Sequence, residues 1–220
     1  MADAPSRLLA RPGGRGAAPA PSGTHELPDK SLLRVPAAAA GGEPCPLLVL
    51  FHGAGSTPEA VLPLLGATGD DAGVIGLAPQ AAGRTWDVIE QGFGLDVRRL
   101  DRALATAFET CPVDPSRIAL GGFSDGASYA LSLGLDNGDL AGHVIAFSPG
   151  FAVPADPRGH PRIFVTHGVR DRVLPIDRCS RRLVPRLRGA GYDVTYEEFD
   201  GGHVVPPPLA RRAIEWFERG

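Results

Sequence analysis

Cysteine, lysine and long apolar runs are scarce in this chain of 220 residues, and each scarcity argues against a class of protein. The three cysteines, Cys45, Cys111 and Cys179, are odd in number and widely spaced, which fits neither a disulfide framework nor a zinc site. We therefore expect reduced thiols and a cytoplasmic protein. No apolar run approaches the length of a membrane-spanning helix. Lys30 is the only lysine, and the net charge of −3 gives no reason to expect nucleic acid or an anionic membrane as a partner.

The start of the chain differs in composition from the rest. It is rich in alanine, proline and glycine, and Pro12 and Gly13 interrupt the segment in which a signal peptide would have its apolar core. We predict that residues 1–23 form a flexible or extended arm. Residues 24–220 are predicted to form a single domain, long enough to bury a large core. The sequence leaves a monomer and a homodimer both open.

Short apolar runs alternate with helical patterns through the rest of the chain. Continuous apolar runs bounded by turn signals are typical of parallel strands buried on both faces. The predicted strands cover 31–36, 47–51, 74–78, 117–120, 143–147, 162–166 and 194–199, the last with the alternation of an edge strand. The predicted helices begin near 57, cover about 95–110, follow the strand at 162–166 with a basic face, and cover about 207–218. This alternation predicts an α/β fold, with a mostly parallel sheet and helices on both faces.

One turn carries the strongest chemical signal. An apolar run at 118–121 leads into Gly122-x-Ser124-x-Gly126, and a run of small residues compatible with a helix follows. A serine on a sharp turn from strand to helix projects its hydroxyl clear of the sheet, and the crowded turn needs small residues two positions before and after it. The N-terminal amides of the helix then point toward the same place. We predict that Ser124 is a nucleophile.

A serine hydroxyl needs a base, and the base needs an acid to orient it. Turns of this kind are followed in the chain by the acid and then by the histidine. His203 lies in a flexible loop after the last strand and is the predicted base, and Asp171 follows the penultimate strand and is the predicted acid. Asp177 is the main rival, although it is also placed to cap the next helix. The other candidates fit less well. Three of them open or precede a strand, namely His143, His160 and Asp156. One ends a strand without a loop back to Ser124 (His167), and one lies too near His203 in the sequence (Asp200).

Stabilising an oxyanion takes two backbone amides. The amide after the nucleophile belongs to Asp125, and the second is expected from the loop after an early central strand. The segment 52–55 occupies that place, and the Ala54 amide is our candidate. The carboxylate of Asp125 would be unfavourable beside an oxyanion unless it is turned away or paired.

These motifs together resemble a known family. The segments 50–55, 122–126, 167–175 and 201–203 look like the phospholipase/carboxylesterase branch of the α/β-hydrolases, and the resemblance runs from about residue 31 to the end. It implies the α/β-hydrolase fold and a catalytic apparatus without cofactor or metal. The implied roles are Ser124 as nucleophile, Asp171 as acid, His203 as base, and the Ala54 and Asp125 amides as the oxyanion hole. Many relatives carry glutamine, alanine or methionine where this chain has Asp125, which puts its substrate preference in question.

The connection that carries a helical cap in many lipases is short here. Only Ser148 to Pro161 separates two strands, with four prolines and two glycines, so we expect no cap domain and an open cleft. Trp86, Phe151 and Val173 lie in loops that could line an acyl pocket, and each fits a core or surface position equally well. The predicted function is hydrolysis of small carboxylic esters with short to medium acyl chains. A thioesterase or lysophospholipase is the close alternative, and a non-catalytic binding protein is the distant one.

Overall fold

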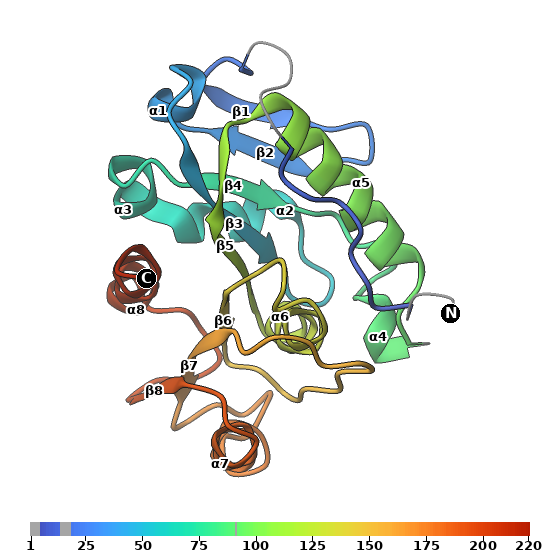
Figure 1. The fold of residues 1–220 in the computed structure, drawn as a ribbon. Helices are drawn as coiled ribbons and strands as arrows, with labels where there is room; N and C mark the ends of the chain where they lie inside the picture. Colours follow the sequence, from blue (N-terminus) through green and yellow to red (C-terminus); the bar gives the residue numbers. More distant parts are fainter. Residues whose placement is uncertain (1–4, 14–18, 91) are drawn as a thin grey trace.

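The computed structural model describes residues 5–13, 19–90 and 92–220. Its centre is one eight-stranded sheet in the order β1-β2-β4-β3-β5-β6-β7-β8 (Figure 1). The strands are β1 Gly23–Glu26, β2 Leu32–Val35, β3 Cys45–Phe51, β4 Ile75–Ala78, β5 Val113–Phe123, β6 His143–Phe147, β7 Arg162–Gly168 and β8 Val194–Phe199. The helices are α1 Ala37–Ala40, α2 Pro58–Val61, the 3₁₀ helix η1 Leu62–Leu65, α3 Gly66–Asp71, α4 Asp87–Glu90, α5 Leu95–Thr110, α6 Asp125–Asp136, α7 Ser180–Gly189 and α8 Pro207–Glu218. No helix within these described residues has the length and hydropathy that crossing a membrane requires.

The predicted α/β fold with a mostly parallel sheet is confirmed. The pairs from β4 through β3, β5, β6 and β7 to β8 are parallel, whereas β1 and β2 join the edge as antiparallel strands. Several elements differ from the sequence prediction. Strand β1 and the short helices α1 and α4 were not expected, and the helix expected near 57 is broken into α2, η1 and α3. Gly66 stands at the second break with a φ of 57°, a conformation that favours glycine.

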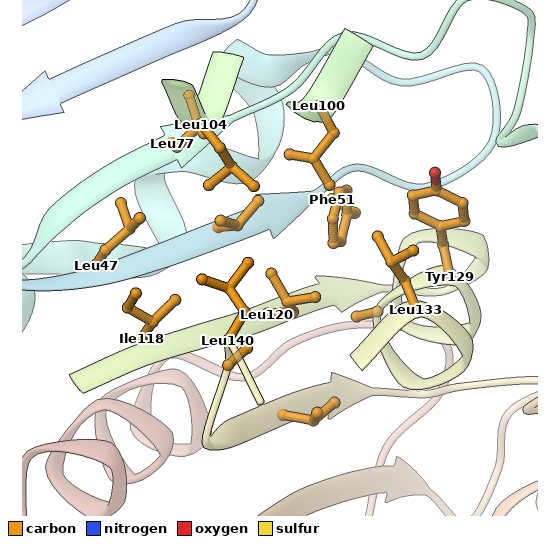
Figure 2. Close-up of a cluster of buried hydrophobic side chains, with 14 of the residues drawn as sticks. Leu47, Phe51, Leu77, Leu100, Leu104, Ile118, Leu120, Tyr129, Leu133 and Leu140 are labelled. Carbon is orange, nitrogen blue, oxygen red and sulfur yellow. The ribbon is translucent and has the colours of Figure 1, made fainter. Parts of the chain in front are cut away.

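Helices cover both faces of the sheet. Along β3, Leu47, Val49 and Phe51 point toward α5 and α6, and Leu48 and Leu50 point toward η1 and α8. Figure 2 shows the first of these cores, in which side chains from β3, β4 and β5 meet those of α5 and α6. A central strand buried on both faces explains why the run at 47–51 is apolar without alternation.

The loop between β6 and β7 is fastened along α6. Three buried side chains spaced by four residues on one side of that helix, Ser128, Ser132 and Asp136, accept hydrogen bonds from loop amides at 2.8–3.0 Å. The amides belong to Gly150, Val153, Ala155 and Asp156. No cap domain is inserted between the described residues of β6 and β7.

The described part of the N-terminal arm is extended and docked. The Leu8 side chain is fully buried in the core beside α5 and α6, and its amide donates to Asn137 Oδ1 at 2.9 Å. The Arg7 guanidinium holds the Asp139 carboxylate with two hydrogen bonds of 2.9 and 2.8 Å. The segment from 5 to 13 therefore ties the amino end of the chain to the turn after α6.

Replacing Leu8 by alanine is expected to lower the free energy of unfolding by about 2–3 kcal/mol, because it removes a fully buried side chain. Leu9→Ala is the matched control, since the neighbouring leucine is 62% exposed. Urea unfolding of the two variants checks the expectation. Equal stabilities would show that burial of the Leu8 side chain contributes nothing to the fold.

A buried histidine makes stability depend on pH. His143 begins β6, and its ring meets Trp216 and Phe217 edge-on with centroids 5.3 Å away. Within the described part of the chain, neither ring nitrogen has a hydrogen-bond partner. Burial, and then the charge of Arg162, lower the pKa of His143 below its ordinary value. The unfolded chain therefore binds the proton first as the pH falls.

We expect the wild type to lose stability as the pH falls below about 6.5, the pKa of an unperturbed histidine. Stability continues to fall until the pH reaches the lowered pKa of His143 in the folded protein. His143→Phe removes this contribution, so the variant should lose less stability between pH 7 and pH 5. Urea unfolding at the two pH values measures the difference. His52 and His167 also have lowered pKa values, but they are present in both proteins and contribute equally to both pH dependences. Identical pH dependence of stability in the wild type and in His143→Phe would therefore contradict this role for His143.

Candidate active site

The turn at Ser124 is built as a strained elbow between β5 and α6. Ser124 has φ 60° and ψ −122°, which lies outside the φ/ψ regions that residues with a side chain normally adopt. Its amide donates to Phe147 O on β6 at 2.9 Å, which helps to hold this backbone in place. A Cβ at Gly126 would lie 2.1 Å from Phe51 O, and one at Gly122 would lie 2.5 Å from the Gly126 carbonyl. Both glycines are therefore required by contact with other backbone atoms.

Three side chains from three loops form a line of hydrogen bonds. The Ser124 hydroxyl lies 2.8 Å from His203 Nε2, and His203 Nδ1 lies 2.6 Å from Asp171 Oδ2. Phe123 packs beside the imidazole, with ring centroids 4.7 Å apart. The Asp171 side chain is fully buried, whereas that of His203 is 14% exposed. The arrangement aims the Ser124 hydroxyl at the His203 imidazole, and the imidazole at the buried Asp171 side chain.

The loops that carry Asp171 and His203 bind each other directly. The Val169 amide donates to Phe199 O and the Arg170 amide to Gly201 O, both at 2.9 Å. The Arg170 guanidinium pairs with Asp200. These contacts, made just beyond β7 and β8, help to explain how the loop after β8 reaches Ser124 in the turn after β5. They also place Arg170 on Asp200 rather than on Asp171.

Asp171 is surrounded by hydrogen-bond donors. Its Oδ1 accepts from the amides of Val173 and Leu174 at 2.9 and 2.8 Å, in addition to the His203 contact on Oδ2. Burial raises the pKa of Asp171, but the hydrogen bond from His203 and those from the backbone outweigh it and lower the pKa below its ordinary value. The side chain is therefore a carboxylate at neutral pH.

A second histidine lies on the other side of the acid. His167 Nε2 is 2.8 Å from Leu174 O and 3.3 Å from Asp171 Oδ2. His167 Nδ1 is 2.7 Å from the buried Ser180 hydroxyl, which can donate to it. Burial lowers the pKa of His167, so the ring is neutral and carries its proton on Nε2, facing two oxygens. No pattern in the sequence indicates these contacts, because Ser180 lies on a different element.

The rival acids are engaged elsewhere. Asp177 is exposed and pairs with Arg181 at 2.8 Å, and Asp156 pairs with Arg158 at 2.9 Å. Asp177 does not cap α7, whose N-cap residue is Cys179. Within the described residues, no group of three or more histidine, cysteine and acidic side chains is arranged to hold a metal ion.

The two candidate oxyanion amides come from segments on either side of Ser124. A Cβ at Gly53 would lie 3.4 Å from Ser124 Cβ, so the loop after β3 passes close to the serine. Among the described residues, neither the Ala54 amide nor the Asp125 amide donates to another backbone group. The Asp125 carboxylate is paired, since its Oδ2 accepts from the Thr85 hydroxyl at 2.7 Å.

The three residues predicted to line an acyl pocket differ in their exposure to solvent. Trp86 does not line the site: its ring is 1% exposed, stacks on Tyr129 at 4.9 Å, and donates from Nε1 to His52 O at 2.8 Å. A large aromatic ring with a satisfied N–H is stable in the core. Val173 is 65% exposed in the loop that carries Asp171, and Phe151 is half-buried in the loop after β6. Sequence alone could not separate these three positions.

Comparisons with known proteins agree with this architecture. The model of the phospholipase/carboxylesterase family matches residues 84–212. Esterase YpfH of Escherichia coli (strain K12) is 33% identical over 182 residues, which cover 72% of this chain and 76% of that protein. Acyl-protein thioesterase 1 of Gibberella zeae is 30% identical over 103 residues, 42% of this chain and less than half (43%) of that protein.

A solved structure extends the likeness to the whole fold. The crystal structure of esterase PE8 superposes with a TM-score of 0.68 and 26% identity, over 85% of this chain and 96% of that one. The family match covers more than half of the sequence and includes the serine turn, both partner loops and the start of α8. The chain therefore belongs to the phospholipase/carboxylesterase family and is an α/β-hydrolase of the carboxylesterase type.

Proposed function

We propose that this protein hydrolyses small carboxylic esters through an acyl-enzyme formed on Ser124. The observation that carries the proposal is the continuous line from the Ser124 hydroxyl to His203 at 2.8 Å and from His203 to Asp171 at 2.6 Å. A neutral serine is a weak nucleophile, and a base within hydrogen-bond reach is what activates it. The esterase name of the Escherichia coli relative supports the same reaction class.

The reaction proceeds in two halves. His203 takes the hydroxyl proton as Ser124 Oγ attacks the ester carbonyl, and the carboxylate of Asp171 stabilises the imidazolium that forms. The Ala54 and Asp125 amides donate to the oxyanion of the tetrahedral intermediate. The imidazolium then gives its proton to the leaving alcohol, which leaves an acyl group on Ser124. Water, deprotonated by His203, attacks this acyl group, and the imidazolium then gives its proton to Ser124 Oγ as the bond to the acyl group breaks and the acid leaves.

The surroundings of the triad favour short and medium acyl chains. The loop after β6, which would carry a cap in other hydrolases, is fastened along α6 instead. Val173 and Val204 are exposed in the two loops that hold the acid and the base. The part of the chain that the structure describes inserts no cap domain between β6 and β7, so we expect no activation at an oil–water interface. The three cysteines are free and buried in the structure, which supports a reducing compartment such as the cytoplasm.

The experiment is hydrolysis of p-nitrophenyl esters from acetate to palmitate by the wild type and by Ser124→Ala. We expect turnover to be highest for acetate to hexanoate and to fall at least about 10³-fold in the variant. The rate should rise smoothly with substrate concentration, without a step at the micellar threshold. Absence of Ser124-dependent turnover on any ester would refute the proposal.

A thioesterase is the second candidate, favoured by the match to acyl-protein thioesterase 1 over 103 residues. The same residues would attack a thioester carbonyl, and the leaving thiolate would need less help from the imidazolium. Paired acyl esters and thioesters of the same chain length separate the two functions. A higher kcat/KM for the thioester at every length, with a maximum at long chains, would favour the thioesterase.

A further inference from the structure

The residue after the nucleophile is an acid, and its side chain is held by a neighbour from a distant loop. The Thr85 Oγ1 hydroxyl donates to Asp125 Oδ2 at 2.7 Å. Thr85 is 8% exposed and Asp125 is half-buried, so this pair is largely shielded from water. A carboxylate at the first position of a helix interacts favourably with the positive end of the helix, which accounts for its stability there. It also brings a negative charge close to the place where the oxyanion forms.

The loop that carries Thr85 is rigidly anchored at its base. The buried Asp96 carboxylate at the start of α5 accepts from the amides of Ala82 and Asp87 at 2.7 and 2.8 Å. In return, Asp87 Oδ2 accepts from the amides of Gly94 and Asp96 at 2.8 Å. These reciprocal bonds fix the two ends of the segment 82–87 on α5. The position of the Thr85 hydroxyl is therefore set by the framework of the domain.

The same segment also holds the other candidate oxyanion loop. The Gly55 amide donates to Arg84 O at 2.7 Å, and Trp86 Nε1 donates to His52 O at 2.8 Å. Arg84, Thr85 and Trp86 are consecutive, and together they contact both segments that supply oxyanion amides. We call residues 82–87 the bridging loop.

We propose that Thr85 is a positioning residue for the oxyanion hole, which keeps the Asp125 carboxylate turned away from the reacting carbonyl. This inference rests on the proposed function and deepens it. Without the hydroxyl, the carboxylate is free to turn toward the oxyanion, and two negative charges then meet in the transition state. The cost of losing Thr85 is therefore set by the charge at position 125. A merely structural contact would cost the same whether residue 125 were charged or neutral.

A double-mutant cycle tests this dependence. Thr85→Val removes the hydroxyl and keeps the shape, and Asp125→Asn removes the charge while its amide oxygen can still accept from Thr85. With p-nitrophenyl acetate, we expect Thr85→Val to lower kcat about 20-fold with KM changed less than about twofold. The kcat of Asp125→Asn, whatever its value, is the reference for the neutral background. The double variant should stay within about threefold of Asp125→Asn.

Two further measurements separate positioning from folding. Active-site titration of the acyl-enzyme burst expresses each rate per folded site, and Thr85→Ser should restore kcat because it restores the hydroxyl. The affinity for phenylboronic acid, whose serine adduct places an oxygen in the oxyanion hole, should weaken in Thr85→Val by about the same factor as kcat/KM.

Three results would overturn the inference. They are a Thr85→Val variant as active as the wild type, an equal loss in the charged and neutral backgrounds, and a loss explained entirely by fewer titratable sites. The proposed function fails in a different way, through absence of Ser124-dependent ester turnover by the wild type. In that case, calorimetry with phenylboronic acid still compares the wild type with Thr85→Val, and equal affinities would overturn the role of Thr85.

Discussion

Replacing Asp171 by asparagine is expected to lower kcat about 10⁴-fold and to change KM little. The asparagine oxygen can still accept from the amides of Val173 and Leu174, so the loop should keep its shape. The amide group cannot pair with the imidazolium of His203, and it favours the tautomer whose proton lies on the wrong nitrogen. Steady-state hydrolysis of p-nitrophenyl acetate, together with a thermal melt, measures both effects.

Asp177→Asn is the matched control for this substitution. Asp177 lies six residues further along, on the same loop, and was the rival acid in the sequence, but it is exposed and pairs with Arg181. Exposed ion pairs contribute little, so this variant should keep at least half of the wild-type kcat. If Asp171→Asn retained more than a tenth of the activity, or if Asp177→Asn lost as much, the assignment of the acid would be wrong.

Replacing Gly126 by alanine is expected to lower the free energy of unfolding by about 4 kcal/mol or more. The new Cβ would lie 2.1 Å from Phe51 O and 2.6 Å from His52 O. Both are backbone atoms at the end of the central strand β3, so no side chain can move aside to make room. Relief requires α6 to shift away from the sheet, and this shift also moves the Asp125 amide. Urea unfolding measures the loss of stability.

Gly189→Ala provides the control, because a Cβ there has no atom within 4 Å and the residue lies at the end of α7. Alanine is a better helix former than glycine, so this variant should be at least as stable as the wild type. A Gly126→Ala protein with wild-type stability and activity would show that the contact between α6 and β3 is looser than the structure indicates.

Patterns in the sequence were sufficient for the central sheet. The strands from β3 to β7 contain short apolar runs bounded by turns, and the helices after β3, β4 and β5 favour parallel pairing, whereas β6 and β7 are joined by a loop without a helix. Strand β1 was missed because Gly23–Glu26 has no apolar run and pairs only at the edge of the sheet. The break near Gly66 was missed because its left-handed conformation is a property of the backbone and not of a pattern.

Some residues of the candidate site could be predicted from the sequence, and others could not. Ser124, Asp171 and His203 each follow a strand in a different loop, and strand order alone brings such loops to one edge of the sheet. Thr85, His167 and Ser180 could not be found like this, because their contacts are made between side chains from different elements. For Trp86 the sequence left a core and a pocket position both open, and the structure buries its ring in the core, because a loop can carry a side chain inward.

The loop between β6 and β7 shares its stability with α6, along which it is fastened. Its amides are held by Ser128, Ser132 and Asp136, which are buried side chains of the helix that begins immediately after the nucleophile. The loop and α6, which begins directly after Ser124, therefore form one cooperative unit, and we expect the loop to open only when that helix does. We expect selection among esters beside this loop to depend on complementarity and not on the opening of a gate.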